Sequence, residues 1–246
     1  MSGVDVQQLH EDPARAVAEA CRALAVAGVL DGILGHISLR ADERSLWVRC
    51  RGRDEPGLRY SRAADVHLVG LDGEAPATPE HRAPNELPIH TAVLRARPDV
   101  HAVVHAHPPH ALLVGLADLA LEPIFGAYDI PAMRLAERGV PVYPRSVLVN
   151  DDEIGREVAE ALGPAQVCLL RGHGIVAVGS SLAAAVVAAD TLERLCRVTV
   201  ELARLGARAA AVPEADRAQL PDLGAGFNDR FAYQHLLARL RAVEGR

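Results

Sequence analysis

The sequence predicts a single α/β domain whose central sheet leans toward antiparallel pairing. Segments with the apolar periodicity of helices alternate with short strand-like segments, and some neighbouring strands are joined by short turns. Half of the 246 residues are hydrophobic, which is enough for a substantial core. No internal repeat, low-complexity tract or domain boundary interrupts this pattern, so one domain is expected over residues 1–246.

The first part of the chain predicts a helix followed by strands. Asp12 suits the N-cap of this helix, Pro13 suits its first position, apolar residues recur over 16–27, and Gly28 ends it. Strands are expected at 32–40 and 45–50, with a turn at 41–43, and at 66–69. The run Gly35-His36-Ile37-Ser38 lies at the start of the first strand, where small residues and an imidazole suit a binding loop.

The remaining elements continue the alternation of helix and strand. They are predicted as a helix at 84–98, a strand at 100–107, helices at 110–119 and 150–163, strands at 166–170 and 175–178, and helices at 182–205 and 228–243. The core is therefore expected over about residues 13–205, with a helical tail at 206–246 in the same domain.

Composition and charge indicate a cytoplasmic protein with a small-molecule partner. The formal charge of −6 and the pI near 6.0 argue against a nucleic-acid or anionic-membrane binder. Residues 1–5 lack the pattern of an export signal, and no apolar run is long enough to span a bilayer. The four cysteines are widely separated and form no Cys-x-x-Cys pair, so we expect small buried hydrophobes in a reducing compartment.

Three histidines are candidates for metal ligands. His105 and His107 end a valine-rich strand segment, and alternate residues of a strand share a face, so both imidazoles are expected to reach one ion. His173 lies between two glycines that let the backbone approach closely. Its imidazole would complete a set of three nitrogen ligands that leaves one coordination position of the metal open for substrate. The alternative is three surface or core histidines. Ligation is favoured because unpartnered imidazoles on a buried face are costly.

Two further groups of polar residues have open interpretations. Residues 51–62 are rich in arginine and form either a solvated loop or a loop that recognises an anion. Glu86 lies near a helix N-terminus, where an ordinary first-turn acid is the simple interpretation. His90 follows one helical turn later and is expected to support the site or the fold rather than to bind metal.

Several spaced motifs together resemble the class II (metal-dependent) aldolase/adducin family. They are Asn85-Glu86-Leu87-Pro88-Ile89-His90, Arg97-Pro98-Asp99-Val100-His101-Ala102-Val103-Val104-His105-Ala106-His107-Pro108 and Arg171-Gly172-His173-Gly174, and the similarity covers about residues 13–205. The resemblance implies an α/β/α sandwich with a mainly antiparallel sheet. It also implies a homotetramer with sites near subunit interfaces and one divalent metal ion per subunit. That ion would be held by His105, His107 and His173, with Glu86 as acid/base. Zinc is expected first, with manganese, iron or cobalt as alternatives.

Departures from the family pattern bear on the substrate. Sugar-phosphate members hold phosphate with a Gly-Asn pair, a Ser/Thr-Gly turn and a Ser-Ser pair, whereas this chain has Gly35-His36, the arginine-rich segment 51–62 and Pro84-Asn85. An unphosphorylated substrate is therefore expected. The Gly-His-Ile-Ser and Pro-Asn-Glu-Leu-Pro runs look more like members that decarboxylate hydroxylated aromatic acids, such as dihydroxyphthalate-type decarboxylases of aromatic catabolism.

The resemblance leads to a metal-dependent carbon–carbon lyase as the expected function. Glu86 or His36 would protonate the ring carbon that loses CO₂, although His36 can also contact substrate or simply cap the strand entrance. Substrate contacts are expected from four residues: Arg51, Arg53, Arg62 and Ser38. The alternatives are an aldolase for an unphosphorylated hydroxy-carbonyl compound, a non-haem iron oxygenase, and an adducin-like interaction module without the metal.

Overall fold

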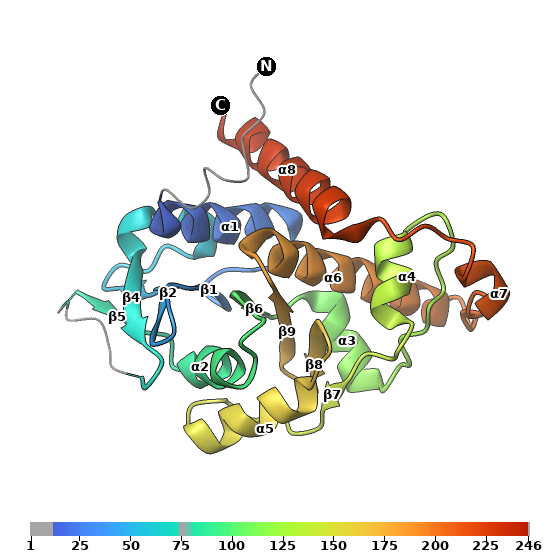
Figure 1. The fold of residues 1–246 in the computed structure, drawn as a ribbon, viewed down its shortest axis with the longest axis horizontal. Coiled ribbons are helices and arrows are strands. Elements are labelled where there is room, and N and C mark those ends of the chain that lie inside the picture. The colour runs from blue at the N-terminus through green and yellow to red at the C-terminus, as the bar shows by residue number, and fades with distance from the viewer. Residues whose placement is uncertain (1–11, 74–77, 79, 246) are drawn as a thin grey trace.

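The computed structural model describes residues 12–73, 78 and 80–245. Residues 1–11, for which the sequence predicts no export signal, lie outside this part of the chain. A seven-stranded sheet passes through the centre of the molecule with helices on both faces (Figure 1). The α/β/α sandwich that the family resemblance implies is therefore confirmed.

The central sheet is antiparallel except at one edge. Its order is β4-β2-β1-β6-β9-β8-β7, and only the pairing of β7 with β8 is parallel. The strands are β1 (His36–Arg40), β2 (Ser45–Arg49), β4 (Val66–Gly70), β6 (Ala102–Ala106), β7 (Val142–Tyr143), β8 (Val167–Leu170) and β9 (Gly174–Gly179). A separate two-stranded sheet pairs β3 (Arg51–Gly52) with β5 (His81–Arg82).

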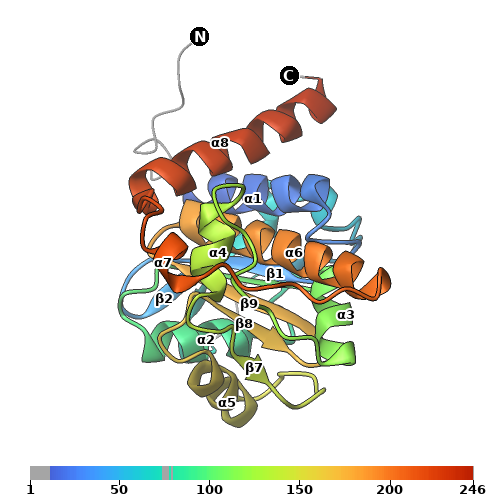
Figure 2. The same cartoon turned by 90° about the vertical axis from the view of Figure 1, so that its right-hand side faces the viewer.

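The helices form a layer on each face of the sheet. They are α1 (Pro13–Ala27), α2 (Leu87–Ala96), α3 (Pro109–Ala117), α4 (Ile130–Ala136), α5 (Asp152–Leu162), α6 (Leu182–Arg204), α7 (Glu214–Arg217) and α8 (Gly224–Glu244), with short 3-10 helices η2 (Leu58–Tyr60) and η3 (Ala63–Asp65). Helices α1 and α6 cover one face, and α2 and α5 cover the other (Figures 1 and 2).

Alternate side chains of the sheet feed two separate cores. On β6, Val104 packs with α1 and α6, whereas Val103 packs with α2 and α5. This alternation follows from the period of two along a strand. Residues of β1 and β6 that share the side of Val103 therefore face α2, which begins next to Glu86.

The predicted capping of α1 is confirmed. The Asp12 side chain accepts a hydrogen bond from the backbone N–H of Arg15 at 3.0 Å, Pro13 begins the helix, and Gly28 ends it with φ +83°. A side chain is strained at such a φ, which is why glycine suits this position. Helix α6 is also close to its prediction, because Ser181 caps it through the backbone N–H of Ala184.

Some local predictions were wrong. The strand expected at 32–40 begins only at His36, because Gly32 and Gly35 have φ of +54° and +100°, which a strand does not allow. Helix α4, strand β7 and the β3–β5 pair were not predicted. Strands β3, β5 and β7 contain two residues each, and their pairing depends on tertiary contacts rather than on a local pattern.

The C-terminal helix α8 lies outermost over α1 (Figures 1 and 2). Four of its side chains are buried in the core with α1 and α6, namely Tyr233, Leu236, Leu237 and Leu240. Arg22 of α1 also pairs with Glu244 at 3.0 Å. All four cysteines are free and buried. Within the described residues, none of the helices combines the length and the hydropathy needed to cross a bilayer.

Candidate metal centre

Four side chains with metal-binding atoms converge at one end of the sheet. They are Glu86, His105, His107 and His173, and one ligand atom of each lies within 4.8 Å of the others. Glu86 and His105 are buried, and His107 and His173 are partly exposed, so the cluster is open to solvent on one side. The structure thus brings together the three histidines and the acid that the sequence singled out.

Strand pairing explains why these histidines meet. His105 lies opposite Val176 in the β6–β9 pair, and His173 immediately precedes β9. His107 lies just beyond the end of β6, yet its ring centroid is 4.8 Å from that of His105. Gly174 is required here, because a Cβ atom at this position would lie 2.2 Å from the carbonyl oxygen of Ala106. A larger residue would push the His173 segment away from β6.

Ring nitrogens of the cluster histidines face one another, and too few N–H hydrogens are available to bridge them. His105 Nδ1 lies 3.0 Å from the carbonyl oxygen of Ile175, which can only accept, so this nitrogen carries the hydrogen. The other ring nitrogen of His105, Nε2, lies 2.9 Å from His107 Nε2 and 3.3 Å from Glu86 Oε2. His173 Nε2 lies 3.3 Å from Glu86 Oε1.

This donor set fits a divalent metal ion. Imidazole and carboxylate are common ligands of such ions, and a backbone acceptor on the remote nitrogen of His105 is the usual way to fix a ligating tautomer. A positively charged ion between the four side chains would bind the lone pairs that converge there. The His/Glu cluster therefore indicates a divalent metal site.

Glu86 is held in place without capping its own helix. It occupies the N-cap position of α2, but its carboxylate accepts a hydrogen bond from the backbone N–H of Val149 at 3.1 Å and faces the histidines. Burial alone would raise the pKa of this carboxyl, but the His105 and His173 imidazoles beside it outweigh burial and hold the pKa well below its usual range. The group is therefore a carboxylate at neutral pH.

His36 lies beside the cluster and belongs to a hydrogen-bonded row. It is opposite His105 in the β1–β6 pair, and the two ring centroids are 5.0 Å apart. His36 Nδ1 lies 2.6 Å from His90 Nε2, and His90 Nδ1 lies 2.6 Å from Ser38 Oγ. Burial lowers the pKa of His90 to about 3 and that of His36 well below its usual value, so both rings are neutral near pH 7.

The predicted substrate residues are not gathered in one place. Ser38 is fully buried and its hydroxyl faces His90. Arg51 donates to the carbonyl oxygen of Ile33 at 3.0 Å, in the loop that leads into β1. Arg53 is exposed. Arg62 is also exposed, and it lines a different surface hollow together with residues of α1 and the end of α8.

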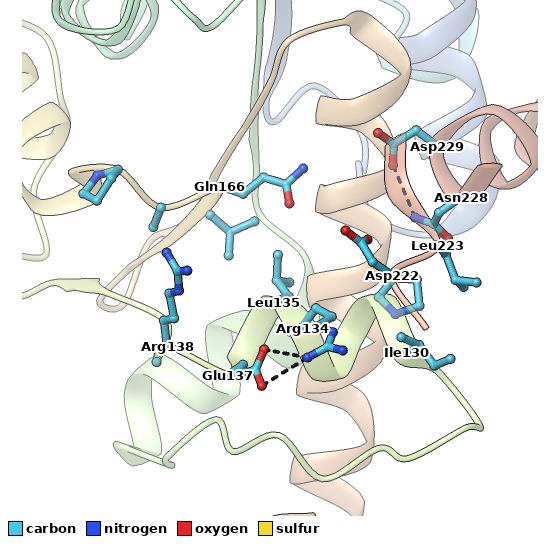
Figure 3. A pocket seen from close by; sticks show the side chains of 15 residues that line it. Ile130, Arg134, Leu135, Glu137, Arg138, Gln166, Asp222, Leu223, Asn228 and Asp229 are labelled. Carbon is cyan, nitrogen blue, oxygen red and sulfur yellow. Dashed lines mark hydrogen bonds and ion pairs between the residues drawn. The ribbon is translucent and has the colours of Figure 1, made fainter. Parts of the chain in front are cut away.

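A pocket at the opposite end of β8 does not contain the cluster. Figure 3 shows Arg134 of α4 paired with Glu137, the residue that follows this helix, at a nearest distance of 3.0 Å. Asn228 and Asp229 at the start of α8 line another side. None of the four cluster residues belongs to its lining, so the candidate chemistry lies elsewhere.

Several contacts that support the centre were not predicted from the sequence. The row formed by Ser38, His90 and His36 follows from the pairing of β1 with β6 and the position of α2, which no local motif reveals. The spacing of four between Glu86 and His90 was the available signal for His90. The contacts from the Val149 N–H and the Ile175 carbonyl are backbone contacts, for which side-chain identity gives no signal.

Known proteins resemble this chain along most of its length. Residues 15–200 match the family model described as Class II Aldolase and Adducin N-terminal domain. The chain is 48% identical to a 3,4-dihydroxyphthalate decarboxylase from Arthrobacter keyseri, over 95% of this chain and 96% of that protein. It is 44% identical to a 3,4-dihydroxyphthalate decarboxylase from Rhodococcus jostii, over 92% of this chain and 95% of that protein.

Solved structures show the same fold at lower identity. An L-fuculose 1-phosphate aldolase from Glaciozyma antarctica superposes with a TM-score of 0.76 at 21% identity, covering 100% of this chain and 96% of that chain. An aldolase II superfamily protein from Pseudomonas syringae superposes with a TM-score of 0.78 at 22% identity, covering 98% of this chain and 95% of that chain.

Proposed function

Because the chain belongs to the class II aldolase and adducin family, we propose that it is a metal-dependent lyase that decarboxylates a hydroxylated aromatic carboxylate of the 3,4-dihydroxyphthalate type. The observation that carries the proposal is its identity of 44% to 48% with decarboxylases of that name over more than nine-tenths of the chain. The complete His/Glu cluster supports an enzyme rather than an interaction module. Such a reaction belongs to the breakdown of aromatic compounds.

We propose one divalent ion per subunit, held by His105, His107 and His173 and contacted by Glu86 in the resting enzyme. Zinc suits this donor set first, and manganese, iron and cobalt share the same ligand types. When bound, the ion supplies a Lewis acid that draws electron density from the oxygens beside the departing carboxylate.

The remaining chemistry is proton transfer by the side chains of the chain. When CO₂ leaves, the carbon–carbon bond breaks, its electron pair stays on the ring carbon, and that carbon needs a proton. The carboxylate of Glu86, buried beside the histidines, can accept the proton of a phenolic hydroxyl and return it to this carbon. His36 is the second candidate, because its ring also borders the cluster.

Among the predicted arginines, Arg51 has the best support as the contact for a substrate carboxylate. It follows β2, at the end of the sheet where β1 begins with His36. The Ile33 carbonyl holds its guanidinium against the loop that contains Gly35, whose backbone approaches the carbonyl oxygen of His105. Arg53 and Arg62 are proposed only as outer contributors to the same positive field, because neither is held toward this loop.

Replacing Arg51 with glutamine is expected to raise KM for the aromatic dicarboxylate and to change kcat little. Loss of a hydrogen bond to a charged group should lower kcat/KM by roughly 10- to 100-fold. Steady-state kinetics test this, and the matched control is Arg44→Gln, which removes an exposed arginine before the opposite end of β2. Equal kinetic constants for the Arg51 and Arg44 variants would show that Arg51 does not contribute to substrate recognition.

We also propose a homotetramer in which a neighbouring subunit covers the site. Several large apolar side chains near the cluster are exposed, and they are Ile33, Leu34, Leu113, Leu116 and Leu148. Ile33 and Leu34 precede the His36 strand, and Leu148 precedes the residue that donates to Glu86. Such gatherings of apolar surface are typical of interfaces. Light scattering of the purified protein measures the assembly, and a monomeric mass would overturn it.

The function is tested by following CO₂ and aldehyde formation under nitrogen. Metal-loaded protein is incubated with catechol carboxylates, including 3,4-dihydroxyphthalate, and with unphosphorylated hydroxy-carbonyl compounds. The proposal predicts release of CO₂ from the dihydroxyphthalate without oxygen. Aldehyde formation without CO₂ would instead identify an aldolase, and turnover that requires air would identify an oxygenase.

A further inference from the structure

The hydrogen-bonded row of Ser38, His90 and His36 leads from the core to the edge of the metal centre. Ser38 and His36 are alternate residues of β1, so they share the face that α2 covers. His90 of α2 is fully buried between them and uses both of its ring nitrogens in this row. In the part of the chain that the structure describes, the Nε2 atom of His36 has no hydrogen-bond partner.

Only two arrangements of the hydrogens satisfy this row while both rings are neutral. A neutral imidazole carries one N–H, so the direction of the bond between Ser38 and His90 decides the direction of the bond between His90 and His36. In the first arrangement the Ser38 hydroxyl donates to His90 Nδ1, His90 Nε2–H donates to His36 Nδ1, and the hydrogen of His36 is on Nε2. In the second arrangement both bonds are reversed.

The burial of Ser38 distinguishes the two arrangements. In the second arrangement the Ser38 hydroxyl accepts from His90, so its own hydrogen needs another acceptor. Its side chain is fully buried, and its Oγ has no other hydrogen bond within the described residues. A buried hydroxyl hydrogen without an acceptor is costly, whereas an unused lone pair on the same oxygen costs less. The first arrangement is therefore favoured.

We propose that Ser38 and His90 are positioning residues that keep the hydrogen of His36 on Nε2, so that His36 meets the substrate as a hydrogen-bond donor. An Nε2 atom that carries hydrogen has no lone pair for a metal ion. Such a ring can border the cluster, with its centroid 5.0 Å from that of His105, and still stand outside the four side chains whose metal-binding atoms converge.

The proposal also separates the roles of His36 and Glu86. A neutral His36 that gave its Nε2 hydrogen to the ring carbon would become an anion, whereas a protonated Glu86 that does so becomes an ordinary carboxylate. His36 therefore donates to an anionic oxygen of the substrate, and the proton transfer belongs to Glu86. The identity of that oxygen, a carboxylate or phenolate oxygen of the aromatic acid, rests on the proposed function.

The tautomer of His36 can be measured directly by ¹⁵N NMR. The full-length protein is labelled at the histidine ring nitrogens and loaded with zinc, and the His36 signals are assigned from their loss in His36→Gln. The expected spectrum shows hydrogen on Nε2 and none on Nδ1. Hydrogen on Nδ1 of His36 would overturn the proposal. This readout does not depend on turnover, so failure of the proposed function would leave it intact.

Variants of Ser38 test whether the row controls this tautomer. In Ser38→Ala the first donor is lost, so His36 is expected to lose its single tautomer, and kcat/KM is expected to fall by about tenfold, as for loss of one hydrogen bond. Ser38→Thr keeps a hydroxyl and is expected to restore both the spectrum and the kinetics. An unchanged His36 spectrum in Ser38→Ala would contradict the proposal.

Two further variants separate positioning from general loss of stability. Thr199→Val removes a buried hydroxyl that donates to the carbonyl oxygen of Leu195 within α6, so it is expected to leave the His36 spectrum unchanged. In His90→Gln the side-chain amide can still donate to His36, and the Nε2 tautomer is expected to persist. A shift of the hydrogen to Nδ1 in His90→Gln would overturn the assignment even if Ser38→Ala does not fold.

Discussion

His107→Ala is expected to abolish stoichiometric metal binding and, with it, decarboxylation. The His107 imidazole supplies one of three converging ring nitrogens, and its Nε2 atom lies 2.9 Å from that of His105. Alanine leaves no ligand atom at this position. Loss of an outer-shell partner alone lowers metal affinity by roughly 10- to 100-fold, so loss of a direct ligand should exceed that. Elemental analysis of the dialysed protein measures the effect.

His101→Ala is the matched control for this change. His101 is exposed and lies just before β6, so its removal deletes an imidazole from the same stretch of chain without touching the cluster. Metal content and turnover are expected to match those of the unaltered protein. One equivalent of tightly held metal in His107→Ala would show that the ligand set is assigned wrongly.

Glu86→Gln is expected to keep the metal and to slow turnover by roughly a hundredfold or more, as for loss of a general acid/base. The amide oxygen can still accept from the Val149 N–H and preserves the shape of the site. It cannot take a proton from a phenolic hydroxyl and return it to carbon. Metal content, kcat and KM are measured together, because the proposal predicts a change mainly in kcat.

Glu153→Gln provides the comparison for the Glu86 variant. Glu153 is an exposed acid in the first turn of α5, so its amide form should retain full turnover. A Glu86→Gln enzyme that turns over as fast as the Glu153 variant would exclude the acid/base role of Glu86. Loss of metal from Glu86→Gln would instead show that the carboxylate is an essential ligand.

Local patterns were sufficient where a short stretch of chain determines the structure. The cap and the terminal glycine of α1 contact residues of the same helix. The histidines of 100–107 lie on or beside one short strand. The class of fold also followed from the sequence, because periodicity and the family motifs both point to a layered α/β domain. These features depend on interactions that the sequence displays directly.

Contacts between distant segments were not predictable in the same way. His36 meets His105 only because β1 pairs with β6 in one register, and a shift by one residue would turn His36 away from α2. The burial of Ser38, which the sequence suggested as a substrate contact, depends on the same pairing together with α2. Arg51 and Arg62 belong to the same arginine-rich segment, yet they face different parts of the surface.

Metal removal and restoration decide whether CO₂ release depends on the ion. The purified protein is stripped of metal with a chelator, and CO₂ release from 3,4-dihydroxyphthalate is followed under nitrogen as zinc, manganese, iron(II) or cobalt is added back. The metal-free protein is expected to be inactive, and its activity is expected to rise with added metal and level off at one equivalent per chain. Full CO₂ release by the metal-free protein would contradict this expectation.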